Sequence, residues 1–151
     1  MPPRKRDINE IIDITAPDFT PEQMAHFREG VRLFNNARYW HAHEAWEAAW
    51  LPMGDGPADD GEIFIRALIQ LASGLHLKRI GRYKGARNQL RKAGEKFAVI
   101  PAYFMGLDAG SLRLFTNFQA KHFHDGDFVC RMTFQEENWQ GKAASTALSG
   151  V

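Results

Sequence analysis

The sequence predicts an all-α fold: a helical bundle of two related hairpins completed by a fifth helix, with a short irregular C-terminal tail. Apolar residues recur at helical spacing in five segments, and turn-forming residues separate these segments. Part of the chain also matches itself at an offset of 44 residues. The 151 residues, of which 44% are hydrophobic, suffice for one buried core without disulfides or a structural metal.

The first helix has a clear start signal. Thr20-Pro21-Glu22-Gln23 combines a capping Thr, a Pro at the first helical position and a Gln at the third, which is a capping-box arrangement. Apolar residues follow at helical spacing, so we expect a helix from 21 to 35. A tight connection at 35–38 leads to a second helix from Tyr39 to Trp50 or Leu51. A loop rich in Gly, Pro and Asp then covers 52–61.

The third helix is apolar on most sides and is expected at the centre of the bundle. Asp59, with Glu62 three residues later, caps its start, and Gly81 ends it after about Ile80. A fourth, amphipathic helix is expected from about 83 to 99. Its outward residues are Lys84, Arg87, Arg91, Lys92 and Lys96.

The last part of the chain loses the helical pattern. Asp108 caps a fifth helix that continues through Phe118, after a break at Pro101. We expect a turn at 124–127, a strand-like alternation at 128–134 and a frayed end from Gly141. These patterns predict a flexible segment over 1–18, a helical bundle domain over 19–123 and a C-terminal extension over 124–151.

The internal repeat relates the first two helices to the third and fourth. At the offset of 44 residues, Gly30 pairs with Gly74 and Trp46 with Leu90. The other pairs include Ala37 with Gly81, Arg38 with Arg82, Tyr39 with Tyr83 and Ala42 with Ala86. This spacing resembles a tetratricopeptide helical hairpin. Because two repeats are fewer than a free-standing array needs, we expect a closed bundle instead.

A polar cluster on the second helix is the candidate functional site. His43, Glu47 and Trp50 lie at i, i+4 and i+7, with Glu44 close by, so they form one stripe next to the inward face. Partial burial of a carboxylate and an imidazole beside each other can tune an acid/base pair. The third helix offers polar partners on an otherwise apolar surface: Arg66, Gln70, Ser73 and His76. Tyr39 and Trp50 flank the cluster and are counted with its binding residues.

Three interpretations of this cluster stay open. In the first, it is a buried network that fixes the two hairpins, with Arg66 facing Glu44 or Glu47. In the second, His43 and Glu47 bind a divalent metal with His76 completing the site, although the H-E-x-x-E pattern lacks the second His of zinc hydrolases. In the third, His43 and Glu47 are the catalytic proton-transfer pair of a metal-free pocket.

Composition limits which classes of partner and which cellular compartment we expect. The net charge of +1 predicts neither a nucleic acid nor a membrane as partner. The single cysteine, Cys130, precludes an internal disulfide, has no strong basic activator and favours a reducing compartment. No apolar stretch reaches the roughly 20 residues of a membrane span, and no secretory signal is evident, so we expect a cytoplasmic protein.

The stretch from Ala42 to Trp50 has the pattern A-H-E-x-x-E-x-x-W, and further motifs follow in 64–72 and at His76. These residues resemble domain of unknown function family 309, a prokaryotic all-α family without an established activity, over about Phe27 to Leu114. The resemblance implies that His43, Glu44, Glu47, Gln70 and His76 belong to the family signature. Arg66 stands where the family usually has Gln, which favours an Arg–Glu brace or an anionic ligand over a metal cation.

The sequence therefore predicts a small ligand-binding or protein-interaction module with a His/Glu pocket between its second and third helices. The alternative is a hydrolase-like or metal-assisted enzyme that uses His43 and Glu47. No cofactor is expected, and a divalent metal stays an alternative. The expected partner is a small ligand or a protein, and exposed aromatics such as Trp40 or Trp139 would suit a homodimer surface.

Overall fold

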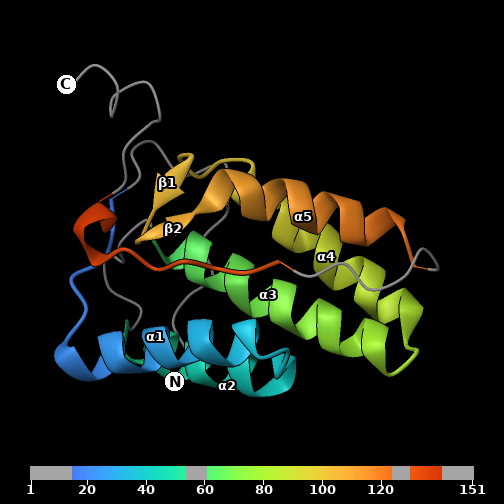
Figure 1. Cartoon of the computed structure of the whole chain (residues 1–151), viewed down its shortest axis with the longest axis horizontal. Helices are drawn as coiled ribbons and strands as arrows, with labels where there is room; N and C mark the ends of the chain where they lie inside the picture. The colour runs from blue at the N-terminus through green and yellow to red at the C-terminus, as the bar shows by residue number, and fades with distance from the viewer. Residues whose placement is uncertain (1–14, 54–60, 124–129, 141–151) are drawn as a thin grey trace.

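The computed structural model describes residues 15–53, 61–123 and 130–140, and it confirms the all-α fold. Five helices follow in order: α1 (Pro21–Asn35), α2 (Tyr39–Trp50), α3 (Gly61–Arg79), α4 (Tyr83–Phe97) and α5 (Ala109–Lys121). Each helix packs on the next one along the chain, with α3 in the middle, between the α1–α2 pair and the α4–α5 pair (Figure 1). The central helix is also the most deeply buried one, as its apolar sequence predicts.

Local signals place the helix ends close to their predicted positions. The predicted capping box at Thr20 is present, and the side chain of Gln23 additionally donates to the carbonyl of Ala49 at 3.0 Å. This bond ties the start of α1 to the end of α2. Asp108 caps α5 by accepting from the backbone N–H of Ser111 at 3.0 Å. The predicted cap at Asp59 lies outside the described residues.

The two hairpin turns are nearly identical, which confirms the repeat. Ala37 (φ 60°) and Gly81 (φ 83°) both adopt the left-handed conformation just after a helix. In the first turn Arg38 N–H donates to Leu33 O at 2.9 Å, and in the second Arg82 N–H donates to Leu77 O at 2.9 Å. These are the bonds of a Schellman motif, which ends a helix and reverses the chain.

Close approach of the helices in each hairpin depends on a glycine. A Cβ at Gly30 would overlap the indole of Trp46, and a Cβ at Gly74 would lie 2.7 Å from Cγ of Leu90. Trp46 and Leu90 are both fully buried. In both hairpins, therefore, a glycine on one helix leaves room for a large apolar side chain on the next helix.

A two-stranded hairpin that the sequence did not reveal joins α4 to α5. Strands β1 (Tyr103–Phe104) and β2 (Leu107–Asp108) pair antiparallel around Met105 and Gly106, which both have positive φ. Such a turn suits the twist of paired strands. Gly106 also lies against the C-terminal segment, because a Cβ there would come within 2.5 Å of the Phe134 ring.

Residues 130–140, which we call the clasp, run beside α1 to the β1–β2 turn, first extended and then as the short 3-10 helix η3 (Glu136–Asn138) (Figure 1). The side-chain amide of Asn35 donates to the carbonyl of Met132 at 2.8 Å and accepts from its N–H at 2.7 Å. Gln135 N–H donates to Gly106 O at 2.8 Å, and Met105 N–H donates to Trp139 O at 2.9 Å. The clasp thus holds the first hairpin against the last helices.

Three expectations need correction, two for the clasp and one for α4. Residues 130–134 alternate between buried and exposed but form no strand, because their backbone bonds go to a helix side chain and a turn. Trp139, expected to be exposed, is partly buried: it packs on Phe19 and Phe27, and its indole N–H donates to Pro17 O at 2.8 Å. Lys96, expected outward, is buried. The predicted turn at 124–127 and the end from Gly141 lie outside the described residues.

The matched left-handed positions make opposite predictions for two substitutions. Ala37→Gly should raise the urea midpoint, because a side chain in this conformation costs about 1–2 kcal/mol, offset in part by the greater chain entropy of glycine. Gly81→Ala should lower stability by about 1 kcal/mol, although no atom lies within 4 Å of the added Cβ. A lower midpoint for Ala37→Gly would contradict this account of the turns.

The clasp contact with α1 predicts a second stability effect. Asn35→Ala should lower the free energy of unfolding by about 1–3 kcal/mol, because the N–H and C=O of buried Met132 lose their partner. Asn36→Ala is the matched control, since that exposed amide bonds only Arg32 O of its own helix among the described contacts. Equal losses in the two variants, measured by urea unfolding, would mean that the clasp contributes little.

Candidate functional site

The face that α2 and α3 form together carries the polar cluster predicted from the sequence. Its centre is Trp40, whose ring stacks on His43 with centroids 4.7 Å apart and planes 24° apart. The same ring meets His76 on α3 at 5.1 Å. Trp40 is 44% exposed, so it covers both imidazoles from the solvent side. The structure thus brings His43 and His76, from two different helices, into contact with one aromatic ring.

His43 and Glu47 form the predicted pair. His43 Nε2 lies 3.5 Å from Glu47 Oε1, one helical turn along α2. The side chains are 15% and 40% exposed, so the imidazole lies mostly inside while the carboxylate reaches solvent. Glu44, expected beside them, instead faces His41 at 3.3 Å on a more exposed part of α2. The dyad is therefore His43 with Glu47 alone.

Within the described part of the chain, three buried polar atoms of the predicted cluster have no hydrogen-bond partner: His43 Nδ1, Trp50 Nε1 and Gln70 Oε1. His43, Glu47 and Trp50 share one stripe of α2. The contact of Trp40 with His76 sets the antiparallel register, which places Gln70 near the level of Glu47. An unpartnered buried polar atom costs about 1–3 kcal/mol. The unpartnered atoms at the α2–α3 face therefore lower the stability of the fold.

Arg66 does not make the expected bridge to α2. Its Nη1 lies 3.3 Å from Glu62 Oε1, one turn earlier on α3, and the Glu62 side chain is fully buried. The sequence indicated Glu44 or Glu47 as the partner, but a carboxylate on the same helix was available at the favoured i, i+4 spacing. This pairing leaves the His43–Glu47 dyad without a cation from Arg66.

Tyr39 and Trp50 contribute in different ways from those predicted. Tyr39 packs on Phe34 and lies under the Arg79 guanidinium, 4.6 Å from the ring centroid. Arg79 also donates to the carbonyl of Ala37 at 2.6 Å, so this end of α3 secures the first hairpin turn. Tyr39 therefore serves the turn. Trp50 is 8% exposed and belongs to the core, apart from its unpartnered indole N–H.

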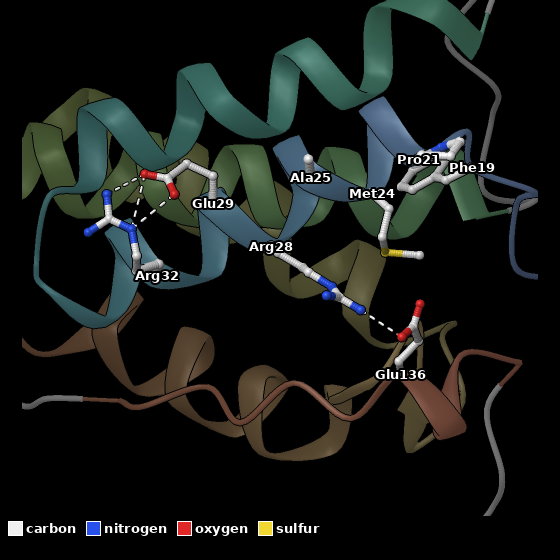
Figure 2. A pocket seen from close by; sticks show the side chains of 8 residues that line it. All are labelled: Phe19, Pro21, Met24, Ala25, Arg28, Glu29, Arg32 and Glu136. Atoms are coloured by element: carbon white, nitrogen blue, oxygen red, sulfur yellow. Dashed lines mark hydrogen bonds and ion pairs between the residues drawn. The ribbon is translucent and has the colours of Figure 1, made fainter.

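An open groove lies on the outer side of α1, away from the polar cluster. It has a volume of about 630 Å³ and lies between Phe19, Met24 and the clasp residue Glu136. Figure 2 shows that its charged side chains face one another in two pairs. Arg28 lies 2.6 Å from Glu136, and Arg32 pairs with Glu29, which lowers the pKa of Glu29 and raises that of Arg32. Because these charges are already matched, we do not place the functional site here.

The metal interpretation gains no support from the described residues, among which no three His, Cys, Asp or Glu side chains are grouped to hold an ion. Burial raises the pKa of the Cys130 thiol, and the negative charge of Asp108 adds to this effect. A raised pKa makes Cys130 a poor nucleophile. Within the described ranges, no helix is long and apolar enough for a membrane span.

Trp40 is the site residue whose role sequence reasoning missed. The sequence indicates only an exposed aromatic at this position, yet the Trp40 ring contacts both His43 on α2 and His76 on α3. The signal was present, because Trp40 lies three residues before His43 and therefore on the same side of α2. The contact with His76 needed the register of α2 against α3.

The family model described as "Domain of unknown function (DUF309)" matches residues 27–89. The matched segment contains all of α2 and α3, most of α1 and the first half of α4, and so includes the whole polar cluster. The clasp and α5 lie outside it. No curated protein matches the sequence.

The raised pKa of Cys130 predicts slow alkylation. Because the thiolate is the reactive form, iodoacetamide should modify the folded protein with a rate that rises at a higher pH than in urea-unfolded protein. The measurement is the alkylation rate between pH 7 and 10, followed by mass spectrometry. If folded and unfolded chains showed the same pH dependence, the thiol would not be shielded as the structure indicates.

Proposed function

Because residues 27–89 match the DUF309 family model, whose description assigns no activity, we propose a function from the site itself. We propose that the α2–α3 face binds a polar ligand, which reaches the buried polar atoms when the Trp40 ring turns aside. Trp40 is the cover, His43 and Gln70 are the binding groups beneath it, and Glu47 lies at the rim. The chain is then a ligand-binding module.

The observation that carries this proposal is the group of unpartnered atoms at His43 Nδ1, Trp50 Nε1 and Gln70 Oε1. A fold optimised for stability alone would place apolar groups there. Functional sites often keep residues that reduce stability, because binding needs them. The structural brace is less well supported, since Arg66 pairs within its own helix and Glu47 is 40% exposed.

The atoms also indicate the chemistry of the ligand. Trp50 Nε1 donates, Gln70 Oε1 accepts, and His43 Nδ1 does either according to its tautomer. His43 and Trp50 are seven residues apart on α2, a rise of about 10 Å. A ligand of this length with both donors and acceptors fits these groups. Amides have that character, so a short peptide-like compound of about three residues is the class that we propose.

A second candidate function is proton transfer by His43 and Glu47, and the 3.5 Å contact between them favours it. In that case Glu47 would orient the imidazole, and His43 would accept or donate the proton. Binding then precedes chemistry at the same face. Turnover of a bound compound that stops in His43→Gln would establish this second function.

The binding proposal can be tested by NMR of the four tryptophan indole N–H groups. We expect N-acetyl-triglycine amide to shift the signals of Trp40 and Trp50. The signals of Trp46 and Trp139 should stay, because these groups already donate to Phe27 O and Pro17 O. Gln70→Leu should abolish the Trp50 shift. A shift of Trp40 alone would indicate surface contact and would overturn the proposal.

The same face predicts unusual stability effects. Gln70→Leu should raise the free energy of unfolding by about 1 kcal/mol, because it removes an unpartnered buried acceptor. Glu47→Gln should change it by less than about 1 kcal/mol, as expected for a partly exposed pair. Urea unfolding at pH 7 measures both. A loss of roughly 3 kcal/mol in Glu47→Gln would instead support the structural brace.

A further inference from the structure

Positive charge is concentrated in one part of this nearly neutral chain. Residues 78–97 contain eight Lys or Arg and one acidic residue, Glu95, which is a net charge of +7. The whole chain has a net charge of +1, so the remainder has a net charge of −6. The small total therefore conceals a strong separation of charge, and the segment comprises the end of α3 and all of α4.

The exposed side of α4 carries three of these charges in a line, which we call the basic stripe: Lys84, Arg87 and Arg91. They lie at i, i+3 and i+7, and all three are exposed. Together with Gly85 and Asn88 they line one open hollow of about 650 Å³. Among the described residues, Glu95 is the carboxylate that pairs with the stripe, at 2.7 Å from Arg91. The guanidinium of Arg87 lies over the Phe123 ring, with its Cζ 4.9 Å from the ring centroid.

The internal repeat shows that this stripe is the counterpart of the candidate site. At the offset of 44 residues, Lys84 corresponds to Trp40, Arg87 to His43 and Arg91 to Glu47. The two hairpins therefore present the same helical positions with different chemistry. On α2, Trp40 stacks on His43 and contacts His76 of α3, whereas Lys84, Arg87 and Arg91 on α4 are all exposed.

We propose that the basic stripe binds the phosphate backbone of a nucleic acid. A basic line along one helix is the electrostatic footprint of such binding. Arg87 and Arg91 offer planar donors that match phosphate oxygens, and Asn88 adds a neutral donor between them. Positions 84 and 91 are separated by a rise of about 10 Å, so the stripe contacts a few consecutive phosphates of a strand.

The composition of the stripe favours this partner over a protein or a membrane. Protein interfaces have an apolar core, whereas protein–DNA interfaces are more polar and much more positive. A helix that binds a bilayer needs an apolar face to insert. The exposed positions 84, 87, 88 and 91 carry no apolar side chain. The aliphatic residues and Phe97 of α4 are buried in the bundle, and Tyr83 at its start is the one large apolar side chain of this helix that is exposed, at 40%.

The test measures binding of the full-length protein to fluorescently labelled duplex DNA and single-stranded RNA by anisotropy between 20 and 200 mM salt. For three phosphate contacts we expect a slope of about −3 in log affinity against log salt on duplex DNA. The triple variant Lys84→Gln, Arg87→Gln and Arg91→Gln should lose nearly all of this binding. Each single substitution should reduce the slope by about 1.

The matched control is Arg32→Gln, Arg113→Gln and Arg131→Gln, which removes the same charge from exposed positions elsewhere. Retained binding in the control and loss in the stripe variant would support the proposal. Equal loss in both would show a general charge effect and would overturn it. It would also be overturned by the absence of binding at 20 mM salt, or by stripe-dependent binding to phosphatidylserine vesicles but not to nucleic acid.

Discussion

The close packing of two helices through a glycine is the interaction on which the rest of this structure depends. Gly30 receives the indole of Trp46, and Gly74 receives Leu90. In each hairpin the missing side chain lets the helix axes approach, and the large residue opposite fills the space at interior density. The same fit occurs in both hairpins, and α3 packs on α4 within its own hairpin and on α2 of the other. The polar face on α2 and the basic stripe on α4 are positioned by this arrangement.

The clasp adds a second kind of stabilisation, one that acts between distant parts of the chain. Asn35 at the end of α1 holds the backbone of Met132 by two bonds, and the β1–β2 turn holds the backbone around Gln135 and Trp139. These contacts use backbone groups, so they depend little on which side chains the clasp carries. They join the first hairpin to the end of the chain, which successive helix packing alone would leave separate.

The repeat also gives the two hairpins equivalent positions that carry different kinds of side chain. The positions at 40, 43 and 47 and those at 84, 87 and 91 have the same place on their hairpins, but not the same surroundings. In the first set His43 is mostly buried beside Trp40, and its Nδ1 has no partner among the described residues. The second set is exposed, so its charges remain solvated and available to a partner. Burial, and not residue type alone, therefore distinguishes the equivalent positions of the two hairpins.

Much of the fold and part of the site were determined by the sequence itself. Capping residues and apolar spacing act over a few residues, so the helix limits, the left-handed turn at Gly81 and the His43–Glu47 pair followed from local rules. The tertiary structure decided what depends on residues far apart in the chain. The pairing of Arg66 with Glu62 on its own helix, the contact of Trp40 with His76, and the path of the clasp over α1 required the register of whole elements. The β1–β2 hairpin was missed for another reason: strands of two residues are too short to show an alternating pattern.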